Sequence, residues 1–395
     1  MKLRGEIIMS SDSSRESSYI KVIGIIFYVM YTLKYSFELT YIHMSNTIDS
    51  MLLMFCVVLA ILAMTMMKMS VKELIVLIGI IIIGLSVYWS SKESLYIMLI
   101  FAAIMIRTTD YRTALWTIFI TKFILTLMIV LLSLLSIIPI GHMLVPKGIF
   151  GFVMGYSLGF SHPNNMAESV FFLIAAYLCI KEEKITIYDG IVIAIVEEAC
   201  YQITKSKATF LLIILMLLLI FLRNTSFIKF IIKKLYGIYI LLISLVISIL
   251  LPMIYAMSTG VVRSISFELN GLLNGRLSNA SHLYELFNLT SFGEIVNDVA
   301  LKQRFGYGVV DNGYSFALFN YGIVGLTLIM LLYLISVRNL LKQGHFVYVI
   351  VILMFLTLGI SENIIRAPYM NFTMIFWYEA IFFNQGLNKD ATKII

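Results

Sequence analysis

Long unbroken apolar runs are the feature of this sequence that most restricts its fold. Segments 211–222 and 241–251, for example, contain no charged residue. A chain with 61% hydrophobic and 13% charged residues has too few polar side chains to cover a soluble domain. The sequence therefore predicts an all-α membrane protein with several spanning helices. It excludes a secreted globular protein, a disordered chain and a nucleic-acid-binding domain.

Apolar segments of about 17–25 residues can cross a bilayer as helices, and a scan for them finds twelve candidates. The fourth is short, the first contains Lys34 and Glu38, and the seventh contains Glu197 and Glu198. The expected spans are 20–42, 51–67, 73–90, 94–106, 113–140, 164–181, 186–203, 208–222, 235–257, 314–336, 345–360 and 367–384.

Basic residues are distributed as expected for a chain with both ends in the cytoplasm. With the N-terminus inside, the cytoplasmic segments and the adjoining span ends hold 18 of the 29 Lys and Arg residues, and the first outer loop, 43–50, holds none. This asymmetry follows the positive-inside rule. The expected organisation is a cytoplasmic tail (1–19), a membrane domain (20–384) with long extracellular loops 141–163 and 258–313, and a cytoplasmic tail (385–395).

The two long loops direct attention to the outer face, because loops of this length are usually functional or mobile. The second loop is expected to contain an amphipathic helix around 283–296. The last expected span contains Phe372, Phe376 and Trp377, which are expected to belong to an aromatic belt at the membrane interface.

Residues 159–168, GFSHPNNMAE, lead into the sixth expected span. Asn165 and Glu168 stand three residues apart, a spacing typical of an N-cap and its reciprocal partner. The positive end of this helix dipole would face outward, where it favours an anion such as phosphate, and His162 adds a titratable donor. An ordinary helix start with a solvated histidine remains an alternative.

Further polar groups occur near the expected outer ends of other spans. Glu198 and Lys205 are seven residues apart and share a helical face, and intramembrane carboxylates are either paired or functional. Arginines of the 258–313 loop are suited to phosphate because the guanidinium is a bidentate fork. A helix cap, an ion pair such as Glu362 with Arg366, or a solvated loop surface remains an alternative for these groups. The other candidates are Lys207, Arg263, Arg276, Arg304, Asp311, Asn312 and Tyr314.

The sequence contains no Cys/His cluster with metal-ligand spacing and no P-loop or dinucleotide-binding motif. We therefore expect neither a metal nor an organic cofactor, and ATP-driven transport is disfavoured. The basic residues of the outer face would then act directly on an anionic substrate.

Residues 155–165, GYSLGFSHPNN, resemble the outer-loop motif of Wzy-type polysaccharide polymerases, which are related to the O-antigen ligases. Later features follow in the family's order: TKSKAT at 204–209, GRL at 275–277, DNGY at 311–314 and NYG at 320–322. Relatives tend to carry Ser-Arg-Thr in the stretch that corresponds to 204–209, where this chain has Lys205 and Lys207.

This resemblance implies a multi-helix glycosyltransferase of the bacterial cytoplasmic membrane that works without a metal. Such an enzyme transfers a glycan from undecaprenyl diphosphate to the next lipid-linked repeat unit, outside the membrane. The implied partners are the undecaprenyl-diphosphate-linked oligosaccharide, the lipid bilayer, a flippase and a chain-length regulator, with no nucleic acid.

The chemistry of this reaction assigns roles to the candidate residues. Arg276 would neutralise the leaving diphosphate. His162 or Glu198 would act as the general base. Further candidates for the base are Glu168, Asp311 and Glu362, since a carboxylate that is buried would have a raised pKa, which suits a base near neutral pH. The substrate-binding set would be Asn164, Asn165, Glu168, Lys205, Lys207, Arg263, Arg304, Asp311, Asn312, Tyr314, Glu362 and Arg366.

Two other functions remain open at this stage. An O-antigen-ligase-like transferase would share the fold and the chemistry but would use a different acceptor. A lipid-linked oligosaccharide flippase should show charged residues lining a central cavity in two related halves. The sequence shows no such symmetry, and its charges concentrate on one face.

Overall fold

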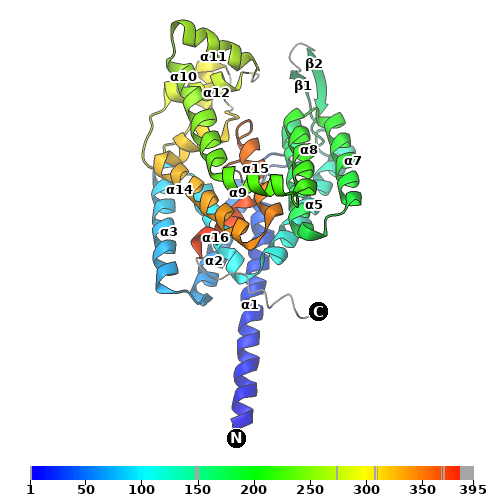
Figure 1. Cartoon of the computed structure of the whole chain (residues 1–395), viewed down its shortest axis with the longest axis vertical. Helices are drawn as coiled ribbons and strands as arrows, with labels where there is room; N and C mark the ends of the chain where they lie inside the picture. Colours follow the sequence, from blue (N-terminus) through cyan, green and yellow to red (C-terminus); the bar gives the residue numbers. More distant parts are fainter. Residues whose placement is uncertain are drawn as a thin grey trace.

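The computed structural model describes residues 2–146, 151–272, 275–306, 308, 310–365, 367 and 370–382. These residues are mostly helical, and Figure 1 shows one bundle from which the first part of α1 projects. A π-helical segment, Leu242–Leu250, joins α9 to α10. The helices are α1 (Lys2–Ser36), α2 (Asn46–Met66), α3 (Val71–Ser91), α4 (Leu95–Met105), α5 (Tyr111–Leu134), α6 (Pro163–Lys181), α7 (Ile187–Thr204), α8 (Lys207–Leu222), α9 (Ser226–Leu241), α10 (Leu251–Met257), α11 (Gly260–Leu272), α12 (Arg276–Leu286), α13 (Asp298–Phe305), α14 (Gly313–Gln343), α15 (Phe346–Leu358) and α16 (Tyr378–Ile381).

Five helical segments among the described residues are long and apolar enough to cross a membrane: α2, α3, α5, α14, and Pro163–Lys184, which contains α6. Helices α8 and α9 pass the same test only together, and the chain bends by 118° between them. They supply a sixth span if the two helices form one broken span. Two other apolar segments, Leu95–Thr108 and Phe346–Leu358, are shorter. By length and composition the chain is an all-α, multi-pass membrane protein.

The prediction of a spanning helix at 367–384 is wrong. The described part of this segment contains a 3-10 turn, Thr373–Trp377, followed by the four-residue helix α16. Phe372 and Trp377 are buried, and their rings contact those of Phe172 in α6 and Tyr333 in α14. The expected interfacial belt is therefore also wrong, because these apolar side chains fill the interior of the bundle.

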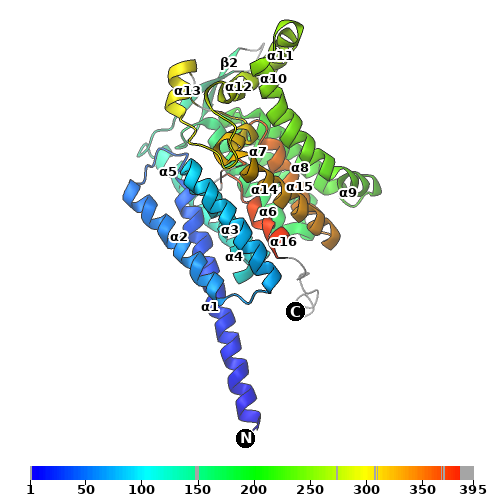
Figure 2. The ribbon, with the colours of Figure 1, turned by 90° about the vertical axis from the view of Figure 1, so that its left-hand side faces the viewer.

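The N-terminal helix is longer than the sequence predicts. Helix α1 begins at Lys2, so it includes most of the segment expected to be a tail, 1–19. Its N-terminal part extends beyond the bundle in both Figure 1 and Figure 2. The tail expected at 385–395 lies outside the described residues.

Both long connections lie at the end of the molecule opposite the N-terminus, as Figures 1 and 2 show. The first contains an antiparallel hairpin of β1 (His142–Pro146) and β2 (Phe152–Tyr156), a small addition to the all-α prediction. The second contains α11, α12 and α13. The amphipathic helix expected at 283–296 is wrong, because α12 ends at Leu286 and the following chain docks on α14.

Helix α14 is interrupted at Gly322, and this interruption holds the second connection in place. Gly322 has φ 75° and ψ 176°, a conformation that is essentially restricted to glycine. Segment 290–294 crosses α14 there, joined to it by three backbone hydrogen bonds of 2.9–3.0 Å. A Cβ on Gly322 would lie only 2.3 Å from the nitrogen of Gly293. Because Gly322 has no side chain, segment 290–294 can approach the backbone of α14 closely. This contact fixes the position of the second long connection, which carries α12.

Candidate functional site

Arg276, the first residue of α12, forms an ion pair with Glu362, which follows α15. The distance between Arg276 Nη2 and Glu362 Oε1 is 3.0 Å. Asn164, near the start of α6, donates from Nδ2 to the same carboxylate oxygen at 3.1 Å. Three segments far apart in the sequence thus meet at the end that carries the long connections. The Arg276 side chain is 27% exposed and that of Glu362 only 10%, so a buried carboxylate holds a guanidinium that ligands can reach.

Glu168 extends this cluster one turn further along α6. It is buried, and its carboxyl group interacts with that of Glu362. Lys122 of α5 is also buried, attracts Glu168 electrostatically and lies over the ring of Phe172, 5.7 Å from its centroid. The polar cluster therefore continues from the end that carries the long connections into the bundle.

Asp311, two residues before α14, adds a third carboxyl group. It interacts electrostatically with Arg276 and Glu362. Burial raises the pKa of Asp311, and the positive charge of Arg276 opposes this shift. Burial also raises the pKa of Glu362, and the positive charge of Arg276 offsets only part of this rise. Carboxyl groups with raised pKa values exchange protons closer to neutral pH than exposed ones.

The start of α6 differs from the prediction. The helix begins at Pro163, and the N-cap is His162. Asn165 donates from Nδ2 to Ser161 Oγ at 2.9 Å, while Glu168 contacts Glu362, so the expected Asn165–Glu168 capping pair is wrong. The reason is Pro163: its fixed φ and missing N–H favour the first helical position, and this makes the preceding residue the cap.

The capping role determines which ring nitrogen of His162 can donate. Its Nδ1 accepts a hydrogen bond from the backbone N–H of Asn164 at 3.0 Å. The proton of the neutral ring is then on Nε2, by assignment from this hydrogen bond. Burial lowers the pKa of His162, which favours the neutral form. In this state Nε2 of His162 is a hydrogen-bond donor, and Nδ1, the nitrogen that could accept a proton, is occupied by the N–H of Asn164.

Glu198 and Lys205 belong to a separate chain of polar contacts on α7. Gln202 Nε2 donates to Glu198 Oε1 at 2.6 Å, and Lys205 Nζ donates to Gln202 Oε1 at 2.8 Å. Lys207, at the start of α8, is exposed. In the part of the chain that the structure describes, the side chains of Glu198 and Lys205 hydrogen-bond to Gln202, and neither residue has an ion pair with the Arg276 cluster.

The other arginines of the second connection do not join the cluster. Arg263 of α11 donates to the backbone carbonyl of Tyr255, and its guanidinium lies 4.6 Å from the centroid of that ring. It therefore anchors α11 to α10. Arg304 is exposed on α13. Arg366, the residue expected near Glu362, lies outside the described residues.

Asn312 and Tyr314 serve the fold of α14. Asn312 is its N-cap, and Oδ1 accepts from the backbone N–H groups of Tyr314 and Ser315 at 3.1 Å each. Tyr314 is buried and donates to the carbonyl of Leu356 at 2.7 Å. These contacts correspond to the structural alternative that the sequence left open.

Lys122 is the member of the cluster to which sequence reasoning gave no role. A lysine inside an otherwise apolar span was the available signal. Its proximity to Glu168 depends on the packing of α5 against α6 and is not readable from spacing.

Within the part of the chain that the structure describes, no group of three or more His, Cys, Asp or Glu side chains is arranged to hold a metal ion. No family model, curated protein or solved structure matches the chain. The chemistry of the site therefore has to be inferred from its own residues.

Proposed function

We propose that this chain is a membrane glycosyltransferase that polymerises undecaprenyl-diphosphate-linked oligosaccharide repeat units on the outer face of the bacterial cytoplasmic membrane. The observation that carries the proposal is the reachable Arg276 guanidinium, which is held by Glu362 and also interacts electrostatically with Asp311. The motif resemblance of residues 155–165 supports the same reaction class. In this proposal the N-terminus is cytoplasmic, and the end with α11–α13 is outside.

Arg276 is proposed to bind the diphosphate leaving group. Cleavage of the sugar–diphosphate bond leaves negative charge on the phosphate oxygens, and a positioned cation stabilises that charge in the transition state. A guanidinium has five N–H donors, and the ion pair with Glu362 engages Nη2. The remaining donors can bind phosphate oxygens while the ion pair fixes the orientation of the group.

Asp311 is proposed as the general base that takes the proton of the acceptor hydroxyl. It is partly exposed, whereas Glu168 is buried and Glu362 is engaged by Arg276 and Asn164. Its raised pKa brings its basicity closer to neutral pH. His162, with its proton on Nε2, is proposed to donate a hydrogen bond to substrate. Glu198 accepts a hydrogen bond from Gln202 on α7, which argues for a role of Glu198 outside this step.

Reconstituted protein tests the proposal. Wild-type protein in lipid nanodiscs, given lipid-linked repeat units from host cells lacking the gene, should produce a ladder of longer glycans. Arg276→Ala should lower the turnover number by about 10²–10³-fold, the usual effect of removing one charge-stabilising group. Lys302→Ala is the matched control, because Lys302 is an exposed cation of the same connection, on α13. A normal ladder from the Arg276 variant would contradict the proposed mechanism.

A further inference from the structure

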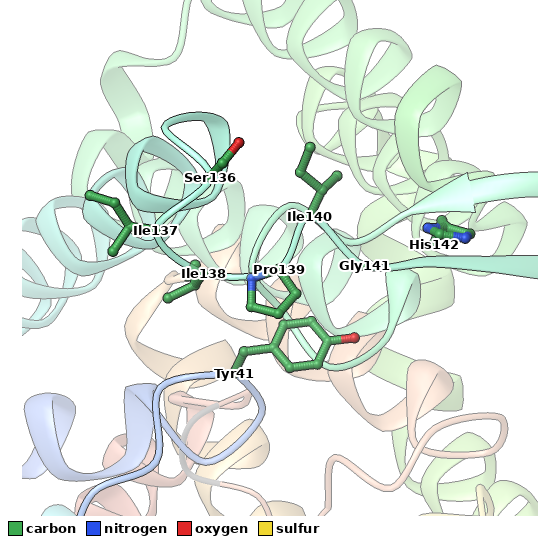
Figure 3. A pocket seen from close by; sticks show the side chains of 8 residues that line it. All are labelled: Tyr41, Ser136, Ile137, Ile138, Pro139, Ile140, Gly141 and His142. Atoms are coloured by element: carbon green, nitrogen blue, oxygen red, sulfur yellow. The ribbon is translucent and has the colours of Figure 1, made fainter.

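A pocket of about 660 Å³ opens at the outer end of the protein, between Tyr41 and segment 136–142 (Figure 3). Tyr41 lies in the connection between α1 and α2, and segment 136–142 leads from α5 into β1. In Figure 3 the ring of Tyr41 lies beside Pro139, with its hydroxyl directed toward the side of Gly141. The volume is within the range of small-molecule binding sites.

The walls of this pocket are fixed by backbone contacts. The N–H of Tyr41 donates to the carbonyl of Gly159 at 3.0 Å, and that of Ser157 donates to the carbonyl of Gly141 at 3.1 Å. Gly141 has φ 64°, and a Cβ there would lie 3.0 Å from the ring of Tyr41. Glycine thus allows the aromatic ring to approach the backbone closely, and the pocket is preformed.

The same backbone contacts place the pocket beside the candidate site. Gly159, which binds Tyr41, precedes His162 by three residues, and three residues span at most about 11 Å. His162 caps the helix whose next turn carries Asn164 and Glu168. A short oligosaccharide can therefore reach from the pocket toward His162.

The lining residues match a neutral sugar. The side chains of Tyr41 and Pro139 present ring faces, on which the apolar face of a pyranose can lie. The Tyr41 hydroxyl, the Ser136 hydroxyl and the His142 ring have no hydrogen-bond partner among the described residues, so they are available to sugar hydroxyls. None of the lining residues is Asp, Glu, Lys or Arg, which disfavours a phosphate or a phospholipid headgroup here.

We propose that this pocket, defined by Tyr41 and residues 136–142, binds one sugar unit of the lipid-linked glycan, apart from the diphosphate site at Arg276. This inference rests on the proposed function, since it assigns the substrate's neutral part to one pocket and its charged part to another. The pocket would set the position of the glycan relative to His162.

Binding of a lipid-free glycan tests the subsite without turnover. The probe is the soluble oligosaccharide released by mild acid from the lipid-linked repeat units of host cells that lack the gene. Saturation-transfer NMR on the full chain in nanodiscs should show binding that Tyr41→Ala weakens about tenfold, while Tyr41→Phe, which keeps the ring, weakens it less. Tyr188→Ala is the matched control, because Tyr188 is an exposed tyrosine outside the pocket. Ile140→Trp should abolish binding by filling the pocket from an exposed position, which keeps the test valid if Tyr41→Ala misfolds.

Kinetics separate failure of the subsite from failure of the proposed function. Tyr41→Ala should raise KM for the lipid-linked unit about tenfold with little change in kcat. Unchanged probe binding by both Tyr41→Ala and Ile140→Trp would overturn the subsite even if the wild type polymerises. Probe binding that depends on Tyr41, in a wild type that makes no polymer, would support the subsite and contradict the function. Displacement of the probe by dihexanoyl-phosphatidylglycerol in a Tyr41-dependent manner would overturn the assignment to sugar.

Discussion

Replacement of Gly322 by alanine should destabilise the protein far more than a matched replacement at Gly344. At Gly322 a side chain would be strained by the backbone conformation and would approach the nitrogen of Gly293 to 2.3 Å. Relief of that clash requires segment 290–294 to leave α14, which breaks three backbone hydrogen bonds. Backbone strain of about 1–3 kcal/mol and a net loss of about 1 kcal/mol per hydrogen bond give about 4–6 kcal/mol in total.

Gly344 provides the control because a side chain there would meet a positive φ without a steric clash. It also has a positive φ, 91°, at the C-terminal end of α14, but no neighbouring atom lies within 4 Å of a Cβ added there. Gly344→Ala should therefore cost only the left-handed backbone strain, about 1–2 kcal/mol. Reversible unfolding by SDS in mixed micelles measures both variants. Equal losses of unfolding free energy would refute the close crossing at Gly322, and with it the anchoring of the connection that carries α12.

Two further predictions concern the site itself. Asp311→Asn should lower kcat by about 10²–10⁴-fold and should remove the acidic limb of the pH–rate profile. In the wild type this limb should lie above the usual pKa of an aspartate, because burial raises the pKa of Asp311 and a base acts only after losing its proton. A pH–rate profile of Asp311→Asn that matches the wild type would exclude Asp311 as the base. His162→Asn should fold normally, since asparagine is also a good N-cap, but should turn over more slowly because the Nε2 donor is lost. Wild-type turnover in this variant would leave His162 with its capping role alone.

Hydropathy predicted most of the helices because a long apolar run in this chain is almost always helical. It failed at 367–384, since apolar residues such as Trp377 face the bundle interior there, and composition does not distinguish burial in protein from contact with lipid. The amphipathic pattern at 283–296 also misled, because α12 ends at Leu286 and the chain after it packs against α14 at Gly322 instead of continuing as a helix. Neither failure is visible without the tertiary contacts that cause it.

The candidate site was predicted as separate residues and was assembled only by the fold. Arg276 and Glu362 are 86 residues apart, and Asn164 and Glu362 are 198 apart, so no spacing rule connects them. The sequence instead suggested the local pair Glu362 with Arg366 as an alternative. Glu198 was chosen because a carboxylate in an apolar helix is costly, but in the structure it is exposed and bonded to Gln202.

Leaflet-resolved sizing of the lipid-linked glycans in cells deleted for the gene tests the central claim most directly. The account predicts that single repeat units accumulate on the outer leaflet, because units reach the outer face and are not joined. Units trapped on the inner leaflet would contradict polymerisation and identify a flippase. Full-length polymer retained on its lipid carrier would also contradict it and identify a ligase.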